Sequence, residues 1–104
     1  MIQFLYFDEC PSWKQALANL HEALAKMHWD PPIEIVEIQT DEQANQYEFQ
    51  GSPSIKFNGV DLWPAKQEKY FLGCRVYHTP AGLRGVPGTE MLQERLQQVR
   101  PTER

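Results

Sequence analysis

The sequence predicts an α/β domain built on a four-stranded mixed sheet with helices on both of its faces. Short apolar runs alternate with amphipathic ones, in the order β-α-β-α-β-β-α. The 104 residues are 41% hydrophobic and 23% charged, which is ordinary for one globular domain with a single core. We therefore expect one domain over residues 1–104, with a loop insertion at 60–70 and a tail at 101–104.

The first half of the chain has the clearest pattern. Residues 2–7 are apolar on both faces, as is typical of a central strand, and a second strand is expected over 33–38. Thr40 or Asp41 would cap a short helix that ends near Phe49. Between the two strands, apolar residues recur at three- and four-residue spacing and predict a helix of about four turns. These residues are Trp13, Ala16, Leu17, Leu20, Ala23, Leu24 and Met27.

The second half supplies the remaining strands and the last helix. We expect a third strand over 54–57, a fourth over 71–77 at the antiparallel edge, a loop over 78–88 and a helix that begins at Thr89. Because helices separate the first three strands, right-handed crossovers would make those three strands parallel to one another.

Composition limits the classes of function. The net charge of −4 argues against nucleic acid or an anionic membrane surface as the main partner. No apolar run approaches the roughly 18 residues of a membrane span. No secretory signal is visible and two cysteines do not form a disulfide framework, so we expect a cytoplasmic protein. No cysteine–histidine spacing matches a structural zinc site, and no metal is expected.

Cys10 is the candidate reactive residue, because it stands where the first strand hands over to the first helix. Pro11 fits the first helical turn, which places Cys10 near the N-cap. The positive end of a helix dipole favours the thiolate, the reactive form of cysteine. Asp8 and Glu9 act against this, because nearby negative charge raises the pKa of a thiol. The alternative is that Cys10 is a small buried hydrophobe.

Cys74 has three interpretations. It is a core residue of the strand predicted at 71–77, the resolving partner of Cys10 in a disulfide, or an exposed thiol with a separate role. A disulfide would require the two Cα atoms to lie within about 7 Å. His78, at the end of the same predicted strand, is either a base or ligand beside Cys10 or an ordinary loop residue.

Two residues beside Cys10 also have alternative roles. Ser12 either donates a hydrogen bond to the thiolate or is an ordinary first-turn residue. Trp13 either shields the thiol and stacks on a ligand or begins the core stripe. Farther along, Trp63, Pro64, Tyr70 and Phe71 form an aromatic-rich patch that either covers the edge strand or makes a dimer contact.

The element order carries a resemblance when it is combined with two motifs. Cys10-Pro11-Ser12-Trp13 opens a helix, and Gly51-Ser52-Pro53 places a proline directly before the third strand. Over residues 2–99 the chain resembles the thioredoxin-like superfamily. The cysteine motif is similar to the Cys-Pro-x-Cys of glutaredoxins with Trp13 in place of the second cysteine. Small bacterial thioredoxin-family proteins share this Cys-Pro-x-Trp opening and a later Cys-Arg-x-Tyr.

The resemblance implies a thioredoxin-like fold in which Pro53 is cis and faces Cys10. The peptide group of Ser52 would be free to pair with the backbone of an extended thiol ligand. Pro11, Ser12 and Trp13 would complete the substrate-binding groove. We expect Pro53 to shape this groove and Ser52 to hold the ligand.

The implied function is that of a monothiol redox protein. Trp13 replaces the second cysteine, so a dithiol cycle cannot run within the motif, and Cys10 would attack a disulfide or an oxidised thiol. An external thiol such as glutathione, or Cys74, would resolve the mixed disulfide. The expected partner is a thiol or disulfide compound, small or carried on a protein, and the expected state is a monomer or weak homodimer.

One alternative is a binding module without turnover, in which Cys10 binds a thiol compound, a soft metal or a partner peptide. A purely structural role, with the aromatic-rich patch as an interface, is a further alternative. The sequence does not decide whether the protein is an enzyme.

Overall fold

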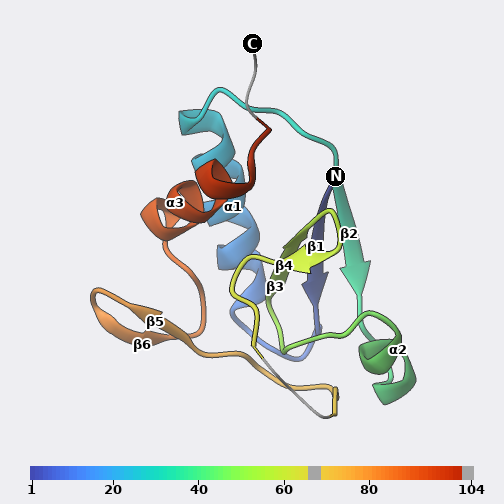
Figure 1. Ribbon diagram of the computed structural model, residues 1–104. Helices are drawn as coiled ribbons and strands as arrows, with labels where there is room; N and C mark the ends of the chain where they lie inside the picture. Colours follow the sequence, from blue (N-terminus) through green and yellow to red (C-terminus); the bar gives the residue numbers. More distant parts are fainter. Residues whose placement is uncertain (66–68, 102–104) are drawn as a thin grey trace.

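A four-stranded mixed sheet forms the centre of the molecule, and helices lie on both of its faces (Figure 1). This computed structural model describes residues 1–65 and 69–101. The predicted α/β class and the mixed sheet are confirmed. In spatial order the strands are β2 (Ile33–Glu37), β1 (Ile2–Tyr6), β3 (Ser54–Phe57) and β4 (Val60–Asp61).

The direction of β3 differs from the prediction. β1 pairs with β2 in parallel, but it pairs with β3 in antiparallel fashion, with Leu5 opposite Ser54. The expectation of three parallel strands is therefore wrong. The reason is the length of α2 (Asp41–Gln46), whose six residues span only about 9 Å along a helix axis. This helix cannot carry the chain back along the sheet, so β3 starts at the end where β2 stops.

This reversal has a consequence for the site. The residues that precede β3, Ser52 and Pro53, lie beside the carboxyl end of β1 instead of at the opposite end of the sheet. The loop that carries Cys10 leaves β1 at that same end. Two segments that are about forty residues apart in the sequence therefore meet.

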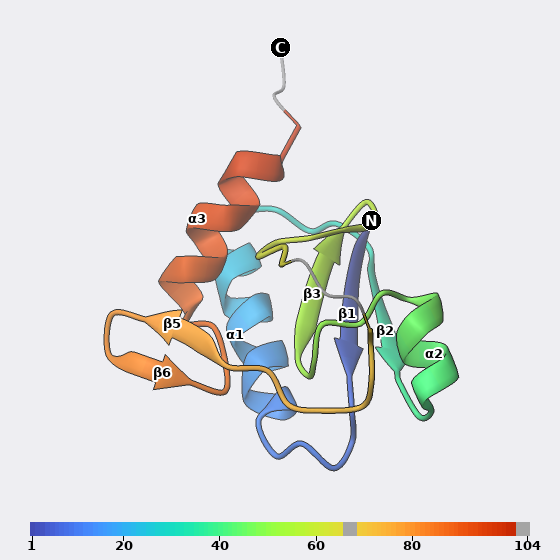
Figure 2. The ribbon, with the colours of Figure 1, turned by 60° about the horizontal axis from the view of Figure 1, so that its bottom comes forward.

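The helices divide between the two faces, as Figure 2 shows. α1 (Trp13–Lys26) and α3 (Thr89–Val99) cover one face, and α2 lies on the other. The predicted stripe of α1 is confirmed, because Ala16, Leu20, Ala23, Leu24 and Met27 are buried and Trp13 and Leu17 are partly buried. Thr40 caps α2 as predicted, since its Oγ1 accepts a hydrogen bond from the Gln43 N–H at 3.1 Å.

Residues 60–88 depart most from the prediction. The predicted insertion at 60–70 begins with the edge strand β4, and its residues 66–68 lie outside the described residues. The predicted strand at 71–77 is not a strand of the sheet. Its backbone pairing is limited to an isolated bridge between Ser52 and Cys74. β4 follows β3 through a tight turn and takes the edge position next to it, so the later segment can reach the sheet only at its end.

The predicted loop at 78–88 contains a hairpin. β5 (Tyr77–Thr79) and β6 (Gly82–Arg84) pair in antiparallel fashion, separate from the main sheet (Figure 1). Of the predicted tail, Pro101 is exposed, and residues 102–104 lie outside the described residues. None of the described helices is both long enough and apolar enough to cross a bilayer.

Candidate thiol site

Cys10 lies in the loop between β1 and α1, ahead of the helix. α1 begins at Trp13, with Ser12 in the N-cap position, so Cys10 is farther from the helix end than predicted. Its N–H donates to the Phe7 carbonyl at 3.0 Å, and this turn folds the side chain inward. The residue is only 2% exposed. The expectation of an accessible thiol at the opening turn of the helix is therefore wrong.

Ser52 connects the two halves of the site. It is fully buried, and its hydroxyl accepts a hydrogen bond from the Phe7 N–H at 2.8 Å. The Cys10 thiol donates to its carbonyl at 3.5 Å. That carbonyl also accepts from the Arg75 N–H at 2.9 Å, and the Ser52 N–H donates to the Gly73 carbonyl at 2.8 Å. The prediction that this peptide group is free for a ligand is wrong, because the chain's own residues 73–75 occupy it.

Residues 71–77, which we call the strap, bring Cys74 to Cys10. Cys74 is exposed, whereas Cys10 is buried, and both are free thiols. A hydrogen bond with the Cys10 side chain, followed by partial burial and the charge of Cys10, raises the pKa of Cys74 to about 11. Cys74 is therefore not the core residue that one interpretation expected. It is an exposed thiol, and it meets the buried Cys10 at Ser52.

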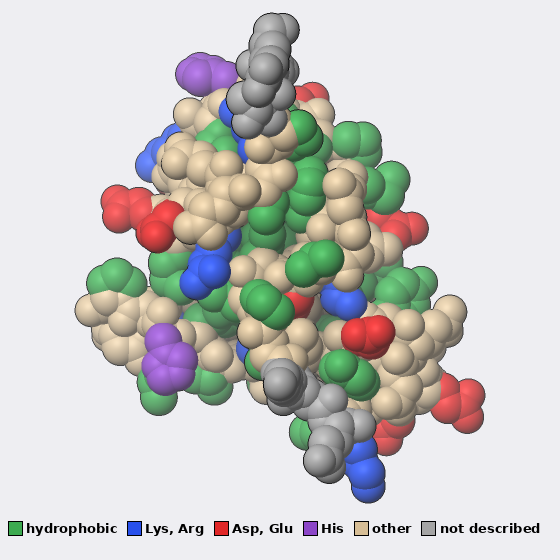
Figure 3. All heavy atoms as spheres, in the orientation of Figure 1, with side chains coloured by type: hydrophobic (Ala, Val, Ile, Leu, Met, Phe, Trp, Pro, Cys, Tyr) green, Lys and Arg blue, Asp and Glu red, His purple; other side chains and the backbone are tan. Residues whose placement is uncertain are grey.

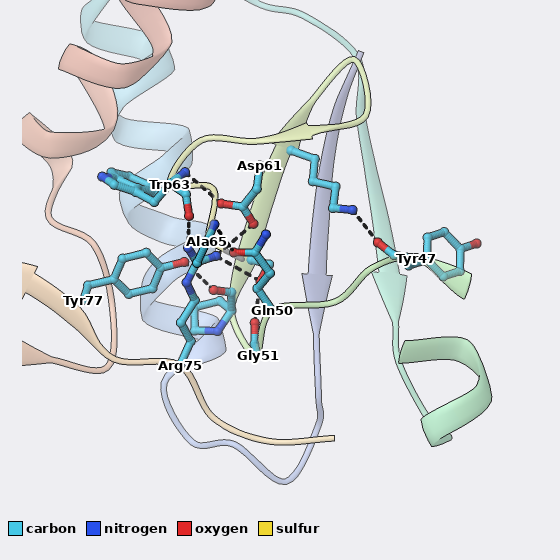
Figure 4. Close-up of polar contacts among 11 residues, drawn as sticks. Tyr47, Gln50, Gly51, Asp61, Trp63, Ala65, Arg75 and Tyr77 are labelled. Atoms are coloured by element: carbon cyan, nitrogen blue, oxygen red, sulfur yellow. Dashed lines mark hydrogen bonds and ion pairs between the residues drawn. The ribbon is translucent and has the colours of Figure 1, made fainter. Parts of the chain in front are cut away.

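The side chain of Arg75 attaches the strap to the sheet (Figure 4). Its guanidinium forms an ion pair with Asp61 of β4, with a nitrogen–oxygen distance of 2.8 Å. The two side chains are 11% and 2% exposed, respectively. The guanidinium also donates to the Ser54 hydroxyl at 3.3 Å and to the Trp63 carbonyl. Sequence reasoning did not identify this ion pair, because Asp61 and Arg75 read as ordinary residues of a loop and a strand.

Further contacts hold the ends of the strap. The Tyr77 hydroxyl donates to the Pro53 carbonyl, and burial raises the pKa of Tyr77. At the other end, the Leu72 N–H donates to Asp41 Oδ1 at 3.1 Å. A close approach in the middle requires Gly51, whose φ is +108°. A Cβ there would lie 3.0 Å from that of Arg75.

The other predicted site residues lie around this pair. The Ser52–Pro53 peptide bond is cis, as expected, and Pro53 is buried. Pro11 is exposed. Ser12 lies against Gly85, where an added Cβ would be 2.6 Å from the Ser12 Oγ. Trp13 is half-buried and stacks on Tyr6 with 4.2 Å between ring centroids, which fits its interpretation as a core residue.

His78 and Trp63 belong to a different part of the molecule. His78 is exposed on the β5–β6 hairpin and shares a surface cleft with Trp63 and Arg95. Trp63 packs edge-on against Tyr77 and beneath the Arg95 guanidinium. In this cleft His78 is grouped with an aromatic cluster and not with Cys10. The predicted aromatic-rich patch does not form one unit, because Trp63 packs on one core cluster, Tyr70 packs on the other, and Phe71 is exposed.

Charge and metal-ligating groups do not point to another kind of site. On the face in Figure 3, acidic and basic side chains of the described residues are interspersed, with no basic patch suited to a nucleic acid backbone. Among the described residues, no three His, Cys, Asp or Glu side chains cluster in a way that could hold a metal ion.

Comparison with models of known protein families, with curated protein sequences and with solved structures gives no match. The candidate site is therefore defined by its own geometry. Its chemical content is two thiols that meet at Ser52, one buried and one exposed, at the end of a sheet and beside a cis proline.

Proposed function

We propose that the protein is a thioredoxin-like thiol–disulfide oxidoreductase that uses Cys10 and Cys74 as a redox pair. The observation that carries the proposal is that both cysteines meet at Ser52: the Cys10 thiol donates to the Ser52 carbonyl at 3.5 Å, and Cys74 forms a backbone bridge with Ser52. Only neighbouring sulfurs can interconvert between a dithiol and a disulfide. The element order and the cis Pro53 at the start of β3 support the thioredoxin-like assignment.

We infer the roles of the two thiols from their exposures, although the raised pKa of Cys74 leaves it only a small thiolate fraction near neutral pH. Cys74 is accessible and meets the substrate, whereas Cys10 is buried and acts second. This order reverses the expectation that Cys10 attacks first. It also makes the protein a dithiol system whose second cysteine comes from a distant segment, although the Cys10 motif itself contains a single thiol.

The reaction proceeds in two exchange steps. The Cys74 thiolate attacks a disulfide RSSR′, forms a Cys74–S–S–R mixed disulfide and releases R′S⁻. The Cys10 thiolate then attacks the sulfur of Cys74, closes the Cys10–Cys74 disulfide and releases RS⁻. The two protein thiols lose two electrons to the substrate disulfide, and their two protons pass to the released thiolates. An external thiol such as glutathione would return the pair to the dithiol state.

Single-cysteine variants test this order. The reduced protein is mixed with hydroxyethyl disulfide, quenched by alkylation and weighed by mass spectrometry. We expect the wild type to lose two hydrogen atoms and to carry no adduct. Cys10→Ser should accumulate a stable mixed disulfide on Cys74. Cys74→Ser should react at least about ten-fold more slowly, because a buried thiol is poorly accessible.

Two results would contradict the proposal in different ways. An adduct that forms on Cys10 in Cys74→Ser as fast as the adduct forms on Cys74 in Cys10→Ser would return the attacking role to Cys10. A wild type that forms no Cys10–Cys74 disulfide in any glutathione redox buffer would reject the redox pair altogether.

A second candidate function is thiol-based binding without turnover, and the same contact favours it. Two adjacent thiolates are suitable ligands for a soft cation such as Cu(I), which prefers sulfur. Titration of the reduced protein with Cu(I) under a competing chelator separates the two functions. Tight one-to-one binding that both Cys→Ser variants abolish, without any disulfide exchange, would favour binding.

A further inference from the structure

The ion pair between Asp61 and Arg75 is buried next to the thiol pair and takes no part in the exchange reaction. Asp61 belongs to β4, where its Oδ1 also accepts the Trp63 N–H at 2.8 Å. Arg75 directly follows Cys74 in the strap. Any contact that fixes the backbone of Arg75 therefore also fixes the Cα position of Cys74.

The ends of the strap are held by the buried Tyr77 and by Leu72, which packs on a core cluster, but fewer contacts hold its middle. Phe71 and Val76, two apolar residues of the strap, are each 59% exposed, so they contribute little hydrophobic burial. The backbone contact is an isolated bridge, with two hydrogen bonds to Ser52, instead of a ladder. By contrast, the Arg75 side chain makes charge-assisted contacts with three separate residues of β3, β4 and the segment that follows β4.

We infer that Asp61 and Arg75 are positioning residues that hold Cys74 against Cys10. This inference deepens the proposed function, because it rests on Cys74 as the thiol that meets the substrate. Asp61 and Arg75 touch neither sulfur in the exchange. They keep the strap against Ser52, so that the second step, attack of Cys10 on the mixed disulfide, occurs within one molecule at short range.

The test compares Arg75→Gln with Arg84→Gln. Arg84 is exposed on the β5–β6 hairpin, and its guanidinium donates to the carbonyl of the adjacent Leu83, so it controls for the loss of one arginine charge. The first readout is the rate at which iodoacetamide alkylates Cys74 at pH 8, resolved by peptide mass spectrometry. The second is the equilibrium of the Cys10–Cys74 disulfide with reduced and oxidised glutathione.

The positioning role predicts that Arg75→Gln makes alkylation of Cys74 faster and not slower. If the strap is released, Cys74 moves away from Cys10, and its pKa falls from about 11 toward the usual value of 9. Alkylation of Cys74 should then become at least about ten-fold faster in Arg75→Gln. A purely electrostatic role predicts the opposite, because removal of a nearby positive charge raises the pKa of a thiol and slows alkylation. The equilibrium constant for disulfide formation should fall at least about ten-fold, since the effective concentration of one thiol at the other falls.

The outcomes separate this inference from the proposed function. If wild type and Arg75→Gln match in both readouts, the positioning role is overturned, while exchange by the pair stands. If the wild type forms no disulfide, the proposed function fails, but the alkylation rates still test the positioning.

Should Arg75→Gln fail to fold, Arg75→Lys carries the test. Lysine retains the charge opposite Asp61 but lacks the several N–H donors of the guanidinium, which also bond to Ser54 and Trp63. Alkylation of Cys74 should accelerate several-fold in this variant, and an unchanged rate would overturn the inference.

Discussion

The two segments that carry the thiols are held in different ways. The Cys10 loop connects two core elements, β1 and α1, and its own turn bonds the Cys10 N–H to the Phe7 carbonyl. The strap depends on partners that are distant in the sequence, including Ser52, Asp61 and Asp41. One thiol is therefore fixed by the core of the fold, and the other is fixed by polar contacts in the middle of the strap and by Leu72 and Tyr77 near its ends. The Cys74 side is the half of the site that a few substitutions can release.

The difference extends to solvent access. Cys10 is buried at the end of the sheet, where its thiol bonds to Ser52, whereas Cys74 is exposed in a strap that also exposes Phe71 and Val76. A thiol pair of this kind exposes one sulfur to a substrate and reserves the other for the second step. Release of the strap would separate the sulfurs and would also uncover Cys10.

Loss of the buried ion pair should produce the largest change in stability. Asp61→Ala leaves the Arg75 guanidinium without its partner, and breaking a buried pair in this way typically costs about 3–5 kcal/mol. Urea unfolding measures the change, and hydrogen exchange at residues 71–77 locates it. We expect exchange in the strap to increase more than exchange in the Cys10 loop.

An exposed ion pair of the same type provides the control. Glu22 and Lys26 lie 3.3 Å apart on α1, and both side chains are 55% exposed. Glu22→Ala should cost no more than about 0.5 kcal/mol. Equal losses in the two variants would contradict the view that the Asp61–Arg75 pair holds the strap.

The Ser52 hydroxyl is the next contact to test, because it links β3 to the Cys10 loop. Ser52→Ala removes the acceptor of the Phe7 N–H, which should cost about 1–2 kcal/mol. Thr40→Ala, which removes the cap of α2 and no contact of the Cys10 loop, should cost a similar amount. Alkylation of Cys10 should accelerate in Ser52→Ala and stay at the wild-type rate in Thr40→Ala. Acceleration in both would assign the effect to global destabilisation.

The predictable part of this molecule is the part that local pattern determines. The stripe of α1, the Thr40 cap and the third strand follow from side-chain spacing and capping chemistry, and each is present as expected. The antiparallel direction of β3 was missed because the pattern shows that a helix exists but not whether it is long enough to cross the sheet. With only six residues, α2 returns the chain at the end where β2 stops.

The strap was missed for a related reason. Alternation from Leu72 to Val76 favours a strand, and an isolated bridge with polar contacts produces the same pattern. The partners of Arg75 lie 12 to 21 residues earlier in the chain, and no single-sequence signal joins them. The motif predicts Cys10 as a site residue, and the structure leaves this residue buried and Cys74 exposed, a difference that depends on tertiary packing alone.

A smaller effect is expected at the other end of the strap. Asp41→Ala removes the acceptor of the Leu72 N–H and also a negative charge in the first turn of α2. Glu42→Ala removes a charge from the same turn and serves as the matched control. We expect Asp41→Ala to lower the free energy of unfolding by about 0.5–1 kcal/mol, which is a larger loss than the loss expected for Glu42→Ala. Equal changes in denaturant unfolding would show that the Leu72 contact contributes nothing.

The smallest expected effect is the pH dependence of stability that arises from Cys74. The fold raises the pKa of this thiol from its usual value near 9 to about 11, so the folded state favours the protonated form. The contribution of Cys74 to stability is therefore complete below about pH 9 and is lost as the pH rises from 9 to 11. Because the thiol is at the surface, solvent screening keeps this contribution small. The free energies of unfolding of wild type and Cys74→Ala, measured from pH 8 to 11, should converge as the thiol ionises. Parallel curves over that range would mean that Cys10 does not raise the pKa of Cys74 in solution, and the two sulfurs would then not be close enough to interact.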